Sequence, residues 1–342
     1  MTIVVLPSNR PAARFYRGGR RITDFRGEPQ AAEFEPEDWV GSATPVSGEA
    51  PAGQTVLADG RLLADALAAD PEPWLGRAHV DAFGADPMLL VKLLDAGQRL
   101  PVHAHPDGEW AAAHVGAAHG KTEAWYILTP GHVHLALERD LDRAELDAIV
   151  AAQDTAAMLA SMHRLEVGPG DVVHVPAGVL HAIGEGILLV ELQEPEDLSI
   201  LVEWDGFAID GPAKGHLGVG FETALGAVER AARSREEVSR LVHRAGTGGP
   251  LLPAEADRFF RLERVLVDGA ATIEPGFAVV VVLDGEVHAA GRRRRDGAAV
   301  PDGVGASTRL VRGSTAVLPH AVGPVRLEGR AEVLVCRPPL PR

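Results

Sequence analysis

The chain has 342 residues, with 33 Lys and Arg against 48 Asp and Glu, so its formal net charge is −15 with histidine neutral. A protein that neutralises nucleic-acid phosphates needs a positive surface. The dense basic run, Arg292 to Arg295, lies in an acidic background, where we expect a solvated hairpin tip. Hydrophobic residues make up 46% and charged residues 24%, as in soluble globular proteins. Composition therefore excludes a chain that is disordered throughout, and it argues against a nucleic-acid binder.

Targeting segments and cysteine chemistry are also restricted by the sequence. The N-terminal apolar run, Ile3 to Pro7, is too short for a signal peptide and is followed by arginines. No stretch approaches the roughly 18 apolar residues of a membrane span. We therefore expect a cytoplasmic protein without a membrane partner. Cys336 is the only cysteine, so any metal site must be built from the 14 histidines and from carboxylates.

Short apolar runs between turn residues dominate the chain. The 38 glycines and 25 prolines separate runs such as 172–176, 187–192, 278–283 and 331–336. Many short strands bounded by turn residues predict a β-sandwich or barrel. Two segments, 139–163 and 221–243, instead place apolar residues at helical spacings. We predict a main β domain over 1–220 with a helical insertion at 139–163, a helical connector and linker over 221–257, and a smaller β domain over 258–342.

Two spaced motifs carry the candidate chemistry. In the string GQRLPVHAH, five residues separate Gly97 from His103, and one residue separates His103 from His105. Residues two apart in a strand face the same side, so both imidazoles can enter one cavity. About 75 residues later, GDVVHVPAGVLH ends at His181. Five other histidines offer alternative ligands: His114, His119, His132, His134 and His174. Two of these, His132 and His134, form a second His-x-His pair. We prefer the first pair because His132 follows a Thr-Pro-Gly turn.

The two strings resemble the paired motifs of the cupins, Gly-x5-His-x-His and Gly-x5-Pro-x-Gly-x2-His. The resemblance implies a jelly-roll barrel that holds one divalent metal ion. Its implied ligands are His103, His105, Glu123 and His181. Three imidazoles and one carboxylate suit Zn²⁺ best, with Mn, Fe, Co or Ni as alternatives. The C-terminal β domain resembles a degenerate cupin that packs against the first.

The flanking residues narrow the resemblance to the type I mannose-6-phosphate isomerase family in its short bacterial form. It is carried by PMLLVKLLDAGQRLPVHAH, GKTEAWYIL and VHVPAGVLHAIGEGILLVELQEPEDLS. It implies a pocket formed by residues that match the family pattern: Glu37 before Trp39, Lys92 eleven residues before His103, Lys121 two before Glu123, and Glu191 ten after His181. Among these, the resemblance implies a catalytic or substrate-binding role for Lys92 and Lys121, proton transfer by Lys121 or Glu191, and substrate binding by Glu37.

The chain departs from the family pattern at two positions. The family usually has glutamine where this chain has His103, which would add an imidazole to the metal site. The family also carries an arginine in a stretch that corresponds to DLSILVEWDG here, and Leu201 falls at that place. A basic segment near the N-terminus could reach a phosphate if it folds over the barrel, although exposed surface charges are the usual state of such residues: Arg10, Arg14, Arg17, Arg20 and Arg21.

The resemblance implies an enzyme that interconverts mannose 6-phosphate and fructose 6-phosphate by proton transfer between C1 and C2. Such chemistry requires a group that polarises the carbonyl oxygen, a base, and groups that hold the open-chain sugar. Three alternatives remain open from the sequence. One is an isomerase of a related unphosphorylated sugar, the second is a non-catalytic sugar-binding cupin, and the third is another cupin enzyme such as an iron oxygenase. The sequence does not indicate the oligomeric state.

Overall fold

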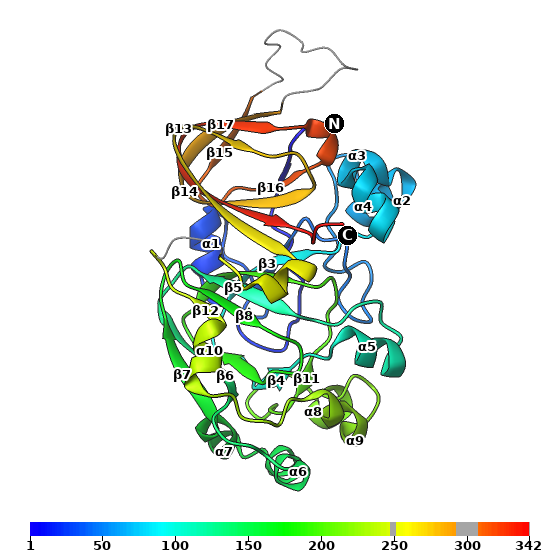
Figure 1. Ribbon diagram of the computed structural model, residues 1–342, viewed down its shortest axis with the longest axis vertical. Helices are drawn as coiled ribbons and strands as arrows, with labels where there is room; N and C mark the ends of the chain where they lie inside the picture. The colour runs from blue at the N-terminus through cyan, green and yellow to red at the C-terminus, as the bar shows by residue number, and fades with distance from the viewer. Residues whose placement is uncertain (247–250, 292–306, 342) are drawn as a thin grey trace.

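The computed structural model describes residues 1–246, 251–291 and 307–341, so the basic run at 292–295 lies outside the described residues. The strands pair antiparallel and form three sheets, one of which lies at the opposite end of the molecule from α6 and α7 (Figure 1). The predicted mainly β fold is confirmed. Within the described ranges, no helix is both long and apolar enough to cross a membrane.

Two of the sheets enclose a barrel. The larger has the order β12-β8-β5-β10-β3-β2 and the smaller β11-β4-β9-β6-β7. Apolar side chains from both sheets, including Trp125, Val133, Ile183 and Leu189, form the core between them. The strands of the larger sheet are β2 (Glu37–Val40), β3 (Leu90–Asp95), β5 (Glu123–Ile127), β8 (Val172–Val175), β10 (Leu188–Gln193) and β12 (Val242–His243). Those of the smaller sheet are β4 (His103–Ala104), β6 (Gly131–Leu137), β7 (Met162–Val167), β9 (His181–Ile183) and β11 (Ile200–Leu201).

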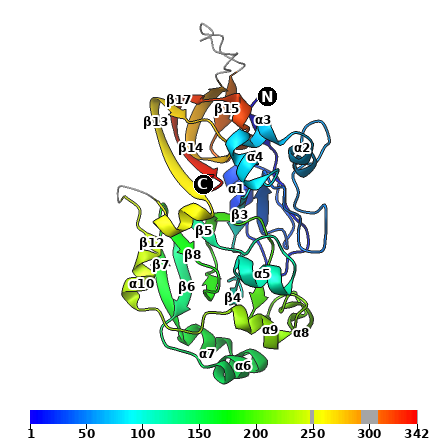
Figure 2. The ribbon, with the colours of Figure 1, turned by 45° about the vertical axis from the view of Figure 1, so that its right-hand side comes forward.

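The third sheet joins the two ends of the chain. Its path runs β1-β16-β14-β17-β13, with β15 paired to β14. The strands are β1 (Val4–Leu6), β13 (Arg261–Ile273), β14 (Ala278–Gly291), β15 (Thr308–Val311), β16 (Thr315–Leu318) and β17 (Val325–Arg337). A shared apolar cluster, which includes Leu6, Val91, Val279 and Leu334, packs this sheet against the barrel (Figure 2). The domain boundary at 258 stays a prediction, but the sheet itself also includes residues 4–6.

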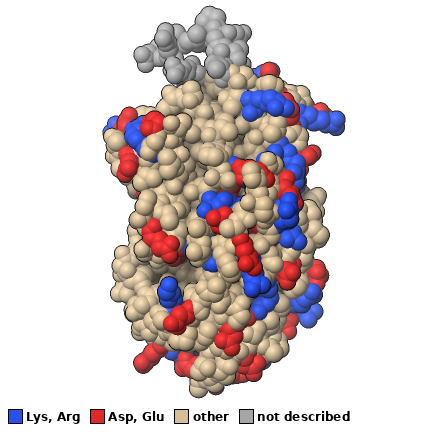
Figure 3. Space-filling view, turned by 180° about the vertical axis from the view of Figure 1, so that it is seen from behind, with Lys and Arg blue, Asp and Glu red and all other residues tan. Residues whose placement is uncertain are grey.

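Helices are short and lie in the connections between strands. They are α1 (Arg21–Arg26), α2 (Leu63–Ala69), α3 (Pro71–Leu75), α4 (Arg77–Phe83), α5 (Gly108–His114), α6 (Arg143–Ala152), α7 (Thr155–Ala160), α8 (Gly211–Lys214), α9 (Phe221–Ala224) and α10 (Arg235–Arg240). Three further turns are η1 (Leu225–Ala227), η2 (Ala254–Arg258) and η3 (His320–Val322). Lysines and arginines are interspersed with acidic side chains over the face shown in Figure 3.

The two segments with helical spacing are interrupted by local backbone constraints. In the first, α6 ends at Gln153, which adopts a left-handed conformation with φ 51°. In the second, residues between η1 and α10 hydrogen-bond to other parts of the fold: the amide of Glu229 donates to the carbonyl of Gly178 in a loop, and that of Arg233 to the carbonyl of Leu137 at the end of β6. Ser234 then begins α10 with a capping box to Glu237. Contacts with the rest of the fold thus override helical propensity over 228–233.

Gly97, which opens the first motif, allows the N-terminal segment to pass close to the barrel. A Cβ atom at this position would lie 2.2 Å from the carbonyl carbon of Gly18 and 2.5 Å from the amide nitrogen of Gly19. Both are backbone atoms, which cannot move aside as a flexible side chain can. The glycine is therefore required for the contact between this loop and the N-terminal segment.

We expect Gly97→Ala to lower the free energy of unfolding by about 1–3 kcal/mol, because the new methyl group overpacks this contact. Urea denaturation monitored by tryptophan fluorescence measures the effect. The control is Gly168→Ala, where a Cβ would meet nothing within 4 Å and the change should stay below about 0.5 kcal/mol. Equal stability of the two variants would contradict the close approach.

Candidate active site

Three histidines meet inside the barrel. His103 and His181 are directly paired between β4 and β9, and His105 follows two residues after His103. The ring centres of His103 and His181 are 4.1 Å apart, and His105 lies 4.9 Å from the first and 4.8 Å from the second. All three are buried. Their candidate ligand nitrogens lie within 4.8 Å of one another, so this group could hold a metal ion.

Backbone carbonyls orient the three rings. Each Nδ1 lies at hydrogen-bond distance from a carbonyl oxygen, that of Pro101 for His103 (2.8 Å), Leu198 for His105 (2.6 Å) and Val179 for His181 (2.8 Å). Because a carbonyl only accepts, each Nδ1 donates its proton and each Nε2 is left as a lone pair. Burial lowers the pKa of all three rings, that of His105 to about 3. Neutral imidazoles with free Nε2 atoms are the form that binds metal.

Glu123 adds a carboxylate to the histidine group. Its Oε2 lies 3.1 Å from Nε2 of His105, and its Oε1 lies 3.4 Å from Nε2 of His181. Lys121 Nζ contacts Glu123 Oε2 and lies 2.8 Å from Nε2 of His105. Burial alone would raise the pKa of Glu123, but Lys121 and His105 lower it well below its usual value. The buried Nε2 of His181 has no hydrogen-bond partner, so the donor set fits a divalent ion.

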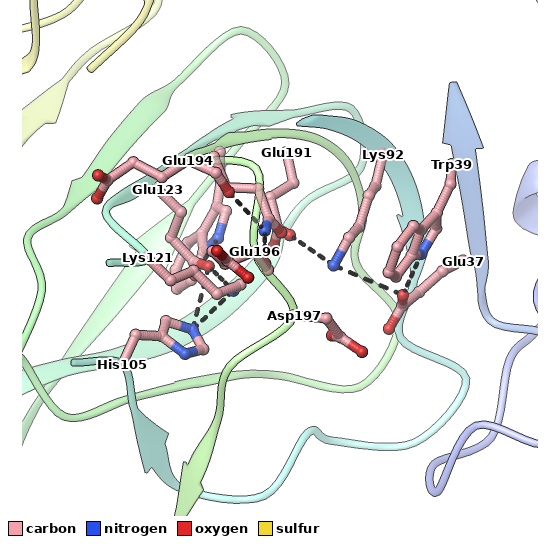
Figure 4. Close-up of polar contacts among 12 residues, drawn as sticks. Glu37, Trp39, Lys92, His105, Lys121, Glu123, Glu191, Glu194, Glu196 and Asp197 are labelled. Carbon is pink, nitrogen blue, oxygen red and sulfur yellow. Dashed lines mark hydrogen bonds and ion pairs between the residues drawn. The ribbon is translucent and has the colours of Figure 1, made fainter. Parts of the chain in front are cut away.

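A second group of charged side chains extends across the neighbouring strands. Lys92 on β3 is paired in register with Trp39 on β2 and with Glu191 on β10. Side chains at paired positions share a face of the sheet. Lys92 Nζ accordingly lies 3.4 Å from Glu191 Oε1, 3.7 Å from Glu37 Oε2 and 4.6 Å from the centre of the Trp39 ring. Figure 4 shows Glu191 between the His105, Lys121 and Glu123 group and the Lys92, Glu37 and Trp39 group.

The pKa values of the two carboxylates beside Lys92 are shifted in opposite directions. Burial raises the pKa of Glu191, and the negative charge of Glu123 raises it further. Burial would also raise the pKa of Glu37, but Arg14 and Lys92 outweigh it and lower the value to about 2. Glu37 additionally accepts hydrogen bonds from the Tyr16 hydroxyl at 2.5 Å and the Trp39 indole at 2.6 Å. Glu37 is thus a fixed anion, whereas Glu191 is easier to protonate.

Two charged residues of this site are not singled out by the motifs. Arg14 and Asp197 form an ion pair with side chains 12% and 10% exposed, and Arg14 Nε also lies 3.4 Å from Glu37 Oε1. The expectation of an exposed N-terminal arginine is wrong for Arg14, because the segment folds inward against the barrel. It holds for Arg17 and Arg20, whose side chains are 61% and 68% exposed. A sequence signal for Arg14 exists only in its aromatic neighbours, Phe15 and Tyr16.

The remaining candidates lie apart from the ligand group. His132 and His134 face each other on β6, with ring centres 5.6 Å apart, and His119 pairs with Asp86 at 2.7 Å. His174 is buried and pairs in register with Ala124, the residue after Glu123, so it faces the other side of the sheet. Leu201, at the position of the family's arginine, is buried and paired in register with His103.

Comparison with known proteins finds relatives that are mannose-6-phosphate isomerases. The sequence is 29% identical over 259 residues to mannose-6-phosphate isomerase ManA of Bacillus subtilis, covering 72% of this chain and 74% of that protein. It is 32% identical over 190 residues to the mannose-6-phosphate isomerase of Streptococcus mutans. That second match covers 54% of this chain and 56% of that protein, just over half of either. No family model matches the sequence.

Solved structures share the fold over nearly the whole chain. The mannose 6-phosphate isomerase of Bacillus subtilis superposes with a TM-score of 0.71 at 21% identity, covering 98% of this chain and all of that one. A point variant of phosphomannose isomerase from Salmonella typhimurium gives a TM-score of 0.74 at 14% identity, covering 99% of this chain and all of that one. At these identities the likeness establishes the fold.

The buried histidine group thus belongs to a chain that is similar to mannose-6-phosphate isomerases in sequence and in fold.

We expect His105→Ala and His181→Ala to abolish tight metal binding, because each removes one of the candidate ligands that converge in the barrel. The metal content of dialysed protein, measured by mass spectrometry, should fall from about one divalent ion per chain to a small fraction of that. The control is His134→Ala, which removes a buried histidine of the second His-x-His pair and should leave the metal content unchanged. Loss of the ion in the control alone would show that the site is wrongly assigned.

Proposed function

We propose that the protein interconverts mannose 6-phosphate and fructose 6-phosphate. The observation that carries the proposal is one buried site in which His103, His105, Glu123 and His181 lie beside Lys121, Glu191, Lys92 and Glu37, in a chain whose curated relatives are mannose-6-phosphate isomerases. These eight residues combine metal ligands, a candidate base, and charged donors and acceptors for sugar hydroxyls.

The ion would be held by the three Nε2 atoms and the Glu123 carboxylate. Zn²⁺ suits three imidazoles and one carboxylate best, although Mn, Fe, Co and Ni accept the same donors. A bound divalent ion would stabilise the negative charge that develops on the sugar oxygens during proton transfer. The three carbonyl contacts to Nδ1 would keep the rings oriented toward the ion.

Glu191 is the better candidate for the base that moves the carbon-bound proton. Its buried Oε1 lies 3.4 Å from Lys92 Nζ and has no hydrogen-bond partner among the described residues, and its pKa is raised, which brings it closer to that of an effective general base. Its carboxylate would take the proton from C2 of the open-chain aldose, and the electron pair left behind would form the C1=C2 bond of the enediol. The carbonyl electron pair of C1 would move to O1, which takes up a proton that balances the one O2 releases later. Glu191 would then deliver a proton, partly exchanged with solvent, to C1, while the hydroxyl proton on O2 leaves and O2 becomes the ketose carbonyl.

Lys121 is held by Glu123 and His105, so in this proposal it binds the substrate oxygens nearest the ligand group. Lys92 and Glu37 lie farther along the site and would bind hydroxyls of the sugar chain as donor and acceptor. A related unphosphorylated sugar is the second candidate substrate. The observation that favours it is the buried, uncharged Leu201 at the place of the family's arginine.

The metal-loaded protein should convert mannose 6-phosphate to fructose 6-phosphate in a coupled assay, and chelation should abolish turnover until Zn²⁺ is restored. Free mannose, assayed in parallel, should turn over more slowly. Activity on free mannose alone would support an isomerase whose substrate is an unphosphorylated sugar. Bound metal without turnover of either sugar would contradict the proposal and favour a sugar-binding cupin.

Glu191→Gln should lower kcat by about 100-fold or more, the usual contribution of a general base, while KM and metal content change little. Exchange of the C2 hydrogen of mannose 6-phosphate with solvent, followed by deuterium incorporation, should be lost to the same extent. The control is Glu185→Gln, which alters an exposed carboxylate just before the same strand. If Glu191→Gln keeps full exchange, the proton is moved by another group, and Lys121 becomes the base.

A further inference from the structure

The positive charges of the site come from three separate parts of the chain. Lys92 lies on β3, Lys121 precedes β5, and Arg14 belongs to the N-terminal segment between β1 and α1. The Arg14 side chain is 12% exposed. Its Nη2 and Nη1 lie 3.2 and 3.3 Å from the two carboxylate oxygens of Asp197, a paired geometry that orients the guanidinium.

Arg14 also lies next to Lys92 and Glu37, the residues proposed to bind the hydroxyls of the sugar. The guanidinium carbon lies 5.8 Å from the centre of the Trp39 ring, and Lys92 Nζ lies 4.6 Å from the centre of the same ring. Glu37 is shared by the two cations, with Oε1 3.4 Å from Arg14 Nε and Oε2 3.7 Å from Lys92 Nζ. Arg14 therefore contacts Glu37 and lies near the same tryptophan ring as Lys92.

No charge enters the site from position 201. Leu201 on β11 is paired with His103 and is 2% exposed, so its side chain is enclosed beside the ligand group. A cation that balances the site's carboxylates must therefore come from elsewhere in the chain. Asp197 lies four residues before Leu201, in the connection between β10 and β11, and it is this residue that binds Arg14.

Counting charges shows how finely the site is balanced. The ion pairs described above link three cations, Arg14, Lys92 and Lys121, to four carboxyl groups, Glu37, Glu123, Glu191 and Asp197. With every group ionised, a divalent ion would change the sign of this balance from negative to positive. Without Arg14, the same ion would only neutralise the site. The ability of the loaded site to attract an anion thus depends on each of the three cations, Arg14 included.

We propose that Arg14 is a positioning residue that gives the sugar site its specificity for an anionic substrate, by neutralising Asp197 and Glu37 from the N-terminal segment in place of a charge at position 201. The inference rests on the proposed sugar-phosphate isomerase function. Arg14 acts through these two carboxylates, so the charge balance, and not a contact with the phosphate, is the property that matters.

The test compares binding of sorbitol 6-phosphate, an open-chain polyol phosphate that cannot isomerise, with binding of sorbitol. Dissociation constants are obtained for the metal-loaded protein from the ligand-dependent rise in Tm. The variants are Arg14→Gln, Arg14→Lys and the double variant Arg14→Gln/Asp197→Asn, which removes one charge of each sign. The matched control is Arg17→Gln, an exposed arginine of the same segment that pairs with Glu33.

Arg14→Gln should weaken sorbitol 6-phosphate binding by about tenfold or more and sorbitol binding by less than about threefold, because an extra net negative charge opposes only the anion. The double variant should bind sorbitol 6-phosphate within about threefold of wild type, since the charge balance is restored. Arg14→Lys should also recover binding, and Arg17→Gln should match wild type. In the coupled assay, KM for mannose 6-phosphate should rise in Arg14→Gln more than kcat falls.

Equal losses for the two ligands in Arg14→Gln would overturn the proposal, because a purely structural role affects both. A double variant no better than Arg14→Gln would also overturn it, because charge balance would then not be the cause. The Tm of each unliganded variant shows whether it folds, and Arg14→Lys covers the case in which Arg14→Gln does not. A wild type that binds sorbitol 6-phosphate without turning over mannose 6-phosphate would refute the proposed function alone.

Discussion

The pairing of buried charges is the constraint on which this site depends. An ionised side chain inside a protein is costly unless an opposite charge and hydrogen bonds replace the water it loses. Lys92 lies between Glu191 and Glu37, Arg14 lies between Glu37 and Asp197, and Lys121 lies against Glu123. Each of these side chains is nearly enclosed, so the loss of any one would leave a neighbour buried without its partner.

Strand register places these charges in order. Trp39, Lys92, Glu191 and Trp125 occupy paired positions on four adjacent strands, β2, β3, β10 and β5. Side chains at such positions project from the same face, so a single register fixes the row that leads toward the ligand group. A slip of one residue between β3 and β10 would turn Lys92 away from Glu191 and bury a leucine in its place. The apolar core on the other residues of these strands opposes that slip.

The sequence predicts the parts of the site that lie on regular strands. The two-residue spacing of His103 and His105 needs only the alternation of a strand, and the glycine, proline and histidine spacing before His181 recurs in a known family. Lys92 could be inferred to face a cavity because its neighbours in LLVKLLDAG are apolar. Arg14 and Asp197 could not be found this way. They lie outside regular strands, 183 residues apart, and their pairing depends on how two loops pack.

The third sheet explains how the N-terminal segment holds Arg14 in a defined position. Residues 4–6 form β1 and pair with β16, so the segment starts from a fixed strand. Asn9 then holds the segment against β2. Its side chain donates to the carbonyls of Trp39 and Gly53, and its backbone amide donates to the Asp38 carboxylate. Beyond Arg14, Gly18 and Gly19 pass against Gly97. A segment held on both sides of Arg14 loses little further conformational entropy when the ion pair with Asp197 forms, so the pair can be ordered by the fold before substrate arrives. The third sheet thereby contributes to the site through the N-terminal segment.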